Sequence, residues 1–428
     1  SRGGARSPLL HFGRVSDCVS VTPRDSVRPA VSAAQDDHVL TGAFESLSPP
    51  SRQVWGKHDR KSGDWLPLFQ HMIDSAAVAG RLWDVWLPEN VKRLIAQPLP
   101  GGTEDARALT VWLAAVHDVG KASPAFACRV DTLAQRMRDA GLQMHPPEHF
   151  GTDRRLAPHG LVGQLLLQEW LAERHGWSDR ASAQFAVVVG GHHGVPPGHQ
   201  EIHDLLLRPE LVRPSDASGE LWKRVQYELL DVCSRAAVVE GRLPRWRKVK
   251  LPQPVQVLLT AVVIVADWIA SSVELFPHCG SGSADTAGLQ PVASRLDAAW
   301  RRLDLPARWS VQEPSGTAAD LLAARFGFPT GSVRPVQEEA VRVAREMEPT
   351  GLLLIEAPMG EGKTEAALAA AEILAARTGA GGCMVALPTQ ATSDAMFGRL
   401  LRWLDRLPAD GTRSVYLAHA KAALNEEW

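Results

Sequence analysis

Apolar residues recur at helical spacing over residues 55–272, in segments rich in Ala, Leu, Val and Trp that Gly and Pro clusters separate. Spacing of i, i+3 and i+4 gathers apolar side chains on one face of a helix, so this stretch predicts an all-α domain. Residues 1–51 are rich in Ser, Pro, Arg and Asp without a sustained period, which predicts a disordered extension. We place the helical domain at 52–280 and a linker with lead-in helices at 281–330.

The pattern changes after Val333, where two short apolar runs, 352–355 and 384–387, flank an Ala-rich helical segment. Runs of this length and composition are typical of buried strands, and a helix between them predicts a β-α-β unit of a parallel sheet. The expected fold class is therefore an all-α domain followed by a partial α/β lobe at 331–428.

Composition and charge narrow the function classes. The 428 residues are 45% hydrophobic and 22% charged, which excludes a mainly disordered protein, and a net charge of −2 excludes a generally basic nucleic-acid coat. The five cysteines form no C-x-x-C pair, so they indicate neither a disulfide framework nor a thiolate zinc site. The longest apolar run, 257–266, is about half of a bilayer span. We expect a cytoplasmic protein that does not contact a membrane.

A phosphate-binding loop follows the first apolar run. Residues 357–364 read Ala-Pro-Met-Gly-Glu-Gly-Lys-Thr and open the Ala-rich helix. Gly360 and Gly362 would let backbone N–H groups curl around a polyphosphate, Lys363 would reach the β- and γ-phosphates, and Thr364 would bind magnesium. The loop predicts binding of ATP with Mg; the alternative is a Gly-rich turn with an incidental lysine.

Histidine and aspartate form a second pattern, inside the helical domain. An amphipathic helix ends at the adjacent pair His117 and Asp118, followed by Gly120 and Lys121. An imidazole beside a carboxylate suits transition-metal ions, and a carboxylate can bridge two of them. Asp267 lies on a very apolar helix, where a buried carboxylate costs several kcal/mol unless it is paired or binds metal. Further candidates in helical contexts are His71, His159, His192 and His193. Each alone could be a core, capping or loop residue.

One basic segment is a candidate track for a single DNA strand. Cationic side chains with an aromatic ring between them suit a strand, because phosphates need positive charge and bases need π-faces. The segment contains Arg245, Trp246, Arg247 and Lys248. The alternative is a solvated linker whose Trp packs on the core. Arg154 and Arg155, just before His159, are a second candidate.

The order of these residues resembles the HD-domain metal-dependent phosphohydrolases. With the phosphate loop C-terminal to them, residues 55–428 resemble the nuclease-helicases of type I CRISPR systems. The loop and its neighbours resemble the first RecA-like lobe of superfamily 2 helicases, which implies that Gln337 contacts adenine and Thr389 a DNA phosphate. No D-E-x-H or D-E-x-D box follows, so we expect that this chain alone does not unwind DNA.

The resemblance implies two divalent metal ions, which could be Mn, Fe, Co, Ni or Mg. Three side chains would act in catalysis: His117, Asp118 and Lys121, the lysine offsetting charge on the scissile phosphate. One ion would be held by His71, His117, Asp118 and Asp267. The other would be held by His159, His192 and His193, with Asp118 bridging the two.

The function implied is an endonuclease or exonuclease on single-stranded DNA. In the full-length family this activity is coupled to ATP-dependent translocation and unwinding, and a CRISPR surveillance complex with guide RNA recruits the enzyme to degrade invading DNA in antiviral defence. Two alternatives stay open: an HD phosphohydrolase acting on nucleotides or cyclic dinucleotides, and a non-catalytic, truncated DNA-binding fragment.

Overall fold

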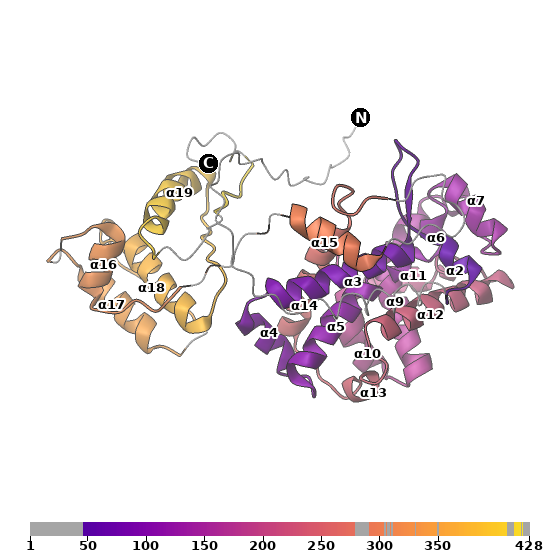
Figure 1. Ribbon diagram of the computed structural model, residues 1–428, viewed down its shortest axis with the longest axis horizontal. Coiled ribbons are helices and arrows are strands. Elements are labelled where there is room, and N and C mark those ends of the chain that lie inside the picture. Colours follow the sequence, from indigo (N-terminus) through magenta and orange to yellow (C-terminus); the bar gives the residue numbers. More distant parts are fainter. Residues whose placement is uncertain are drawn as a thin grey trace.

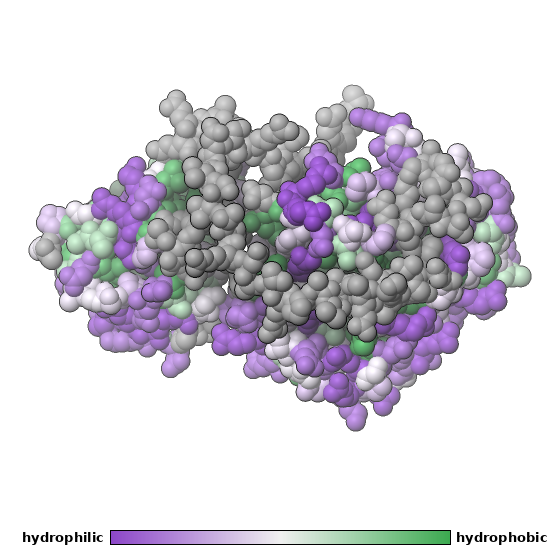
Figure 2. All heavy atoms as spheres, viewed as in Figure 1, coloured by the Kyte–Doolittle hydropathy of each residue, from purple (hydrophilic) through white to green (hydrophobic). Residues whose placement is uncertain are grey.

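The computed structural model describes residues 46–278, 291–303, 305, 309, 311–329, 331–348, 351–408, 415–420 and 422 (Figure 1). Most of the expected disordered extension, residues 1–45, lies outside these ranges, as does 279–290 at the start of the expected linker. Figure 2 shows hydrophilic residues over much of the lower outer surface of the chain in this view.

The N-terminal part is built from helices, as predicted. The longer ones are α3 (Leu68–Val85), α5 (Gly102–Val116), α9 (His159–His175), α10 (Asp179–Gly190), α12 (Ser218–Ala236), α14 (Gln253–Ala270) and α15 (Val292–Arg302). The shorter ones are α2 (Pro49–Gln53), α4 (Glu89–Ala96), α6 (Pro124–Ala127), α7 (Asp131–Asp139), α8 (Pro147–Phe150), α11 (His199–Leu206), α13 (Leu243–Trp246), and the single-turn η1 (Val119–Lys121), η2 (Asp153–Leu156) and η3 (Pro209–Leu211).

A single apolar core joins these helices. Helix α3 packs against α5 and α14, and α9 packs against α10. The indole ring of Trp112 on α5 lies between those of Trp170 and Trp246, at centroid distances of 6.4 and 6.2 Å. All three rings are buried, so each removes a large apolar area from water.

Helix α14 has the length and apolar composition of a membrane span, the one such helix in the part of the chain that the structure describes. Its buried face packs against α3, α5 and α10, and it brings Asp267 into the interior of the domain. We therefore interpret α14 as a core helix.

Two features near the N-terminus depart from the predicted all-α domain. An antiparallel hairpin, β1 (Trp55–His58) with β2 (Trp65–Pro67), precedes α3. Residues 46–51, which we assigned to the disordered extension, are ordered: Leu47 is buried, and the backbone N–H of Ser48 donates to Glu228 Oε1 at 2.7 Å. Both segments are too short for their periodicity to be read from sequence.

The C-terminal part contains four described helices, α16 (Ala318–Phe326), α17 (Pro335–Glu346), α18 (Lys363–Thr378) and α19 (Gln390–Leu404). Leu322, Val341 and Ile373 form a small core where the first three of these helices meet. Arg325 and Glu372 form an ion pair at its edge, with Nη2 and Oε1 2.8 Å apart.

The two predicted strands of this part are not formed. The runs 352–355 and 384–387 flank α18 as expected, but neither is a strand, and Leu352 and Met384 are 81% and 88% exposed. A parallel strand is stable only beside hydrogen-bonded neighbours. Within the described ranges no backbone hydrogen bond joins the two runs to each other.

We expect the ion pair between Arg295 on α15 and Asp74 on α3 to be one of the main interactions that stabilise the N-terminal part. Both side chains are buried, and Arg295 Nη2 lies 2.8 Å from Asp74 Oδ2. Burial raises the pKa of Asp74 and Arg295 opposes that rise. Arg295→Ala leaves the buried carboxylate of Asp74 without its cationic partner. We therefore expect the free energy of unfolding, measured by urea denaturation, to fall by about 3 kcal/mol.

The matched control for this substitution is Arg301→Ala, an exposed arginine on the same helix. It should change the free energy of unfolding by less than about 0.5 kcal/mol. Equal effects of the two substitutions would show that the buried pair is not specifically stabilising.

Candidate metal centre

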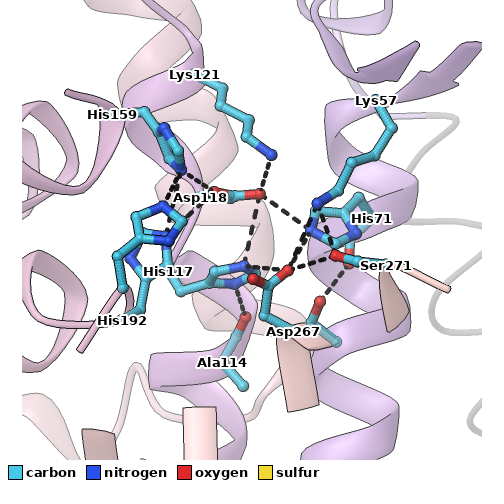
Figure 3. Close-up of polar contacts among 12 residues, drawn as sticks. Lys57, His71, Ala114, His117, Asp118, Lys121, His159, His192, Asp267 and Ser271 are labelled. Carbon is cyan, nitrogen blue, oxygen red and sulfur yellow. Dashed lines mark hydrogen bonds and ion pairs between the residues drawn. The ribbon is translucent and has the colours of Figure 1, made fainter. Parts of the chain in front are cut away.

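Seven candidate ligands converge from five helices on one point in the helical domain (Figure 3). Their places are the first turn of α3 (His71), the end of α5 (His117, Asp118), the first residue of α9 (His159), the turn after α10 (His192, His193) and the last turn of α14 (Asp267). All seven were singled out from the sequence, and the structure brings all of them together.

Gly120 makes this convergence possible. A Cβ at this position would lie 2.0 Å from the carbonyl oxygen of His159 and 2.4 Å from the backbone nitrogen of Gly163. No side chain fits at those distances, so glycine alone allows η1 to approach the start of α9 this closely. The close approach places His159 beside Asp118.

Asp118 is the centre of the cluster. One carboxylate oxygen, Oδ2, lies 3.0 Å from His71 Nε2 and 3.5 Å from His117 Nε2. The other, Oδ1, lies 3.3 Å from His159 Nε2 and 3.6 Å from His192 Nε2. The two oxygens of one carboxylate thus face two separate groups of imidazoles.

The first group is fully enclosed. It consists of His71, His117, Asp118 and Asp267, whose ligand atoms all lie within 4.8 Å of one another and which are all buried. Asp267 Oδ1 is 3.1 Å from His71 Nε2 and 3.5 Å from His117 Nε2. Two carboxylates and two imidazoles form a mixed oxygen and nitrogen donor set of the kind that transition metals accept.

The second group reaches the surface. Its ligand atoms belong to His159, His192 and His193 and also lie within 4.8 Å of one another. The Nε2 atom of His159 is 2.7 Å from that of His193 and 3.3 Å from that of His192. His192 is buried, His159 is half-buried and His193 is exposed, so this group is the accessible side of the cluster.

Hydrogen bonds on the far side of two rings fix which nitrogen faces the centre. His117 Nδ1 lies 2.7 Å from the carbonyl oxygen of Ala114, and His192 Nδ1 lies 2.6 Å from that of Val189. A carbonyl oxygen can only accept, so each Nδ1 carries a hydrogen, and in the neutral ring Nε2 presents a lone pair to Asp118.

One of those lone pairs and one carboxylate oxygen are unsatisfied. His117 Nε2 and Asp118 Oδ1 are buried without a hydrogen-bond partner, whereas Asp118 Oδ2 lies 2.5 Å from Lys121 Nζ. Buried acceptors facing one another are unfavourable unless a cation lies between them. The donor set and its orphaned atoms therefore fit bound metal ions.

The protonation of the imidazoles agrees with this fit. Burial lowers the pKa of His159 to about 2 and that of His192 to about 3, so both rings are neutral near pH 7 and can donate a lone pair. Burial also opposes protonation of His117, but the charges of Asp118 and Asp267 outweigh it and raise the pKa of His117. A proton and a metal ion therefore compete for this position.

Two cations border the cluster. Lys121, expected to face a scissile phosphate, is buried with its Nζ 2.5 Å from Asp118 Oδ2. Lys57 on β1 donates to Ser271 Oγ at 2.6 Å, and Ser271 donates in turn to Asp267 Oδ1 at 2.7 Å. Sequence reasoning missed Lys57 and Ser271. The position of Ser271, one helical turn after Asp267, is a signal that could have found it.

The predicted DNA track is only partly available. Trp246 is buried, and its Nε1 donates to Asp105 Oδ2 at 2.9 Å, so its ring cannot stack on a base and that prediction is wrong. The indole gains more by packing on Trp112 than by lying in water. Arg245 lies 3.6 Å from Asp105 Oδ1 with its side chain half exposed, while Arg247 and Lys248 are exposed.

The phosphate loop has the expected backbone. Gly360 and Gly362 have φ of 83° and 77°, values that favour glycine, and Lys363 begins α18 with Thr364 next. The Lys363 ammonium donates to the carbonyl oxygen of Pro358 at 2.9 Å. The Gln337 side chain is buried and donates to the carbonyl oxygen of Gly362 at 3.4 Å.

The exposed Thr389 caps α19, accepting from the backbone N–H of Thr392 at 3.2 Å. The nucleotide roles of the phosphate-loop residues and Gln337, and the DNA role of Thr389, stay predictions.

Comparison with known proteins identifies the family. The family model "Cas3, HD domain" matches residues 55–276, more than half of the chain. The CRISPR-associated endonuclease/helicase Cas3 of Thermus thermophilus is 33% identical over 387 residues, which cover 90% of this chain and 39% of that protein. The curated relatives are longer, and this chain spans about 40% of their length.

Solved structures agree with this match. A crystal structure of a CRISPR-associated protein superposes with a TM-score of 0.65 at 32% identity, covering 86% of this chain and 39% of that one. A structure described as a CRISPR RNA-guided surveillance complex, pre-nicking, superposes with a TM-score of 0.55 at 26% identity, covering 82% and 38%. The mostly helical HD domain expected from the sequence is confirmed, the C-terminal part is consistent with the helicase lobe of these relatives, and the chain belongs to the Cas3 HD-domain family.

Proposed function

We propose that this chain is a metal-dependent nuclease that hydrolyses single-stranded DNA. The observation that carries the proposal is the buried Asp118 carboxylate, whose two oxygens face two separate groups of imidazole nitrogens. A carboxylate in that position suits two ions at once, and a pair of ions suits a phosphodiester better than most other substrates.

The proposed ligand sets are those of the two groups. One ion would be held by His71, His117, Asp118 and Asp267, and the other by Asp118, His159, His192 and His193. When bound, the ions would clamp the scissile phosphate and lower the pKa of the attacking water. Nitrogen-rich ligands favour Mn, Fe, Co or Ni over Mg.

The remaining side chains hold this arrangement in place. Lys121 neutralises part of the charge on Asp118, and Ser271 fixes the orientation of Asp267. Because His193 is exposed while His71 and His117 are buried, DNA would approach from the His159 and His193 side. His117, Asp118 and Lys121 are the residues that we propose for catalysis.

We further propose that 52–280 is the nuclease domain, 281–330 a linker and 331–428 the start of a helicase lobe that binds ATP with Mg at residues 357–364. The likeness to a structure described as an RNA-guided surveillance complex supports recruitment by such a complex with guide RNA. The relatives' names, nuclease/helicase and endonuclease/helicase, support coupling to DNA unwinding in longer proteins.

Equilibrium dialysis against Mn²⁺ or Co²⁺, followed by elemental analysis, should find two ions per chain. Asp118→Ala removes the shared ligand and should weaken binding of both ions, whereas His193→Ala should weaken only one. His203→Ala, at an exposed histidine outside the cluster, is the control. Two tightly held ions in Asp118→Ala would show that this carboxylate does not bridge.

Ser271→Ala should lower the affinity for one ion by roughly 10-fold or more, because the hydrogen bond that orients Asp267 is lost. Lys57→Met removes the donor to Ser271 and should also lower the affinity for this ion, by a smaller factor. Titration calorimetry measures both effects. Ser272→Ala, the neighbouring serine, should leave the affinity unchanged, and an equal loss there would point to general disruption of α14.

Circular single-stranded DNA should be cut by the chain when Mn, Co, Ni or Mg is added. His117→Ala and Asp118→Ala should reduce the rate at least about 100-fold, while His203→Ala should not. Mononucleotides and cyclic dinucleotides are assayed in parallel. Faster turnover of these than of DNA would replace the nuclease with a nucleotide phosphohydrolase, and no turnover in a folded protein would favour a non-catalytic fragment.

A further inference from the structure

Three arginines lie near one another, and one of them, Arg129, lies close to the accessible side of the metal centre. Arg129 follows α6, Arg154 lies in η2, and Arg60 lies in the turn between β1 and β2. These three residues, called here the arginine cluster, come from segments distant in the sequence. Burial lowers the pKa of Arg129, and the nearby positive charges of Arg154 and Arg60 lower it further.

The cluster lacks carboxylate partners among the described residues. No ion pair joins any of the three to an acidic side chain in those ranges. The acids adjacent to them in sequence are engaged elsewhere: Asp153 pairs with Arg208 at 2.8 Å, and Asp59 accepts from the backbone N–H of Lys61 at 2.8 Å. Like charges held together without a counter-charge are unfavourable, and an anionic ligand removes that cost.

Phe126 joins the cluster to the metal centre. The ring centre of Phe126 lies 5.8 Å from the ring centre of His159, 5.5 Å from Lys121 Nζ and 5.3 Å from the guanidinium carbon of Arg129. Those distances place Arg129 within about 11 Å of His159, close enough for neighbouring nucleotides of one DNA strand to reach both residues.

We propose that the arginine cluster binds a backbone phosphate of the DNA strand a few nucleotides from the bond that is cut. This inference rests on the proposed nuclease function and adds a binding site to it. A guanidinium binds phosphate oxygens through two parallel N–H groups, which fixes orientation as well as charge. Such a contact positions the strand across His159 and His193 and does not depend on base sequence.

The test is binding of a fluorescein-labelled oligo-dT strand to the full chain in EDTA, where hydrolysis cannot occur. Arg129→Gln with Arg154→Gln should raise Kd at least about 10-fold. The slope of log K against log salt should shrink by about 1.4, since each phosphate contact in a single strand contributes about 0.7. Arg129→Lys with Arg154→Lys, which keeps both charges, should retain most of the slope.

Arg180→Gln is the matched control, an exposed arginine at the other end of α10 from His192. It should change neither Kd nor the slope. If the double substitution unfolds the protein, Arg60→Gln in the exposed hairpin turn replaces it, with an expected slope change of about 0.7. The number of metal ions bound should stay the same in every variant.

Three outcomes overturn the proposal: an unchanged Kd and slope in the substituted chains, an equal loss in Arg180→Gln, or displacement of the strand by inorganic phosphate at equal phosphate concentration. Failure of the nuclease is seen separately. The chain could cut no DNA with any metal and still bind DNA less tightly, without metal, when the cluster is substituted. That result would support the phosphate-binding site and refute the proposed nuclease activity.

Discussion

Burial of the Asp118 charge is the constraint on which the rest of the structure depends. A carboxylate enclosed among packed helices is strongly destabilising unless its surroundings compensate for the lost water. Here the compensation comes from Lys121 and from imidazoles on three other helices. Those helices must bring their side chains to the same point, which requires the close approach at Gly120. The imidazoles must also face Asp118, and backbone hydrogen bonds hold His117 and His192 in that orientation.

The two halves of the cluster differ in access, and this difference gives the site a direction. His71 and His117 are sealed in the core, whereas His193 is exposed. Lys57 and Ser271 support the sealed half from outside, through Asp267. Arg129 of the arginine cluster lies against Phe126, whose ring in turn lies 5.8 Å from that of His159. Lys57 and Ser271 thus support the buried group of ligands, whereas the proposed contact with DNA lies near the accessible group.

Sequence reasoning succeeded where a residue was out of place for its local pattern. A buried carboxylate such as Asp267 on an apolar helix is costly unless it is paired, so its need for a partner could be predicted, while its grouping with His117 and Asp118 followed from the family resemblance. Sequence reasoning failed where the position of a residue depended on packing against residues far away in the sequence. Trp246 has basic neighbours, but Asp105 and Trp112 hold it in the core. Lys57 carries no local signal, and the runs 352–355 and 384–387 need strand neighbours that periodicity alone does not supply.

The β1–β2 hairpin is one short element that takes part in both proposed roles, ligand support through Lys57 and DNA binding through Arg60. Lys57 lies within the paired strand, where register with β2 fixes its position, and Arg60 lies in the turn, where no pairing constrains it. Insertions or substitutions in the turn can therefore change the proposed binding of the DNA strand. They leave Lys57, and with it the support of Asp267, in place. The proposed DNA contact of Arg60 and the support of Asp267 by Lys57 can therefore change independently in evolution, although the two residues lie close together in one hairpin.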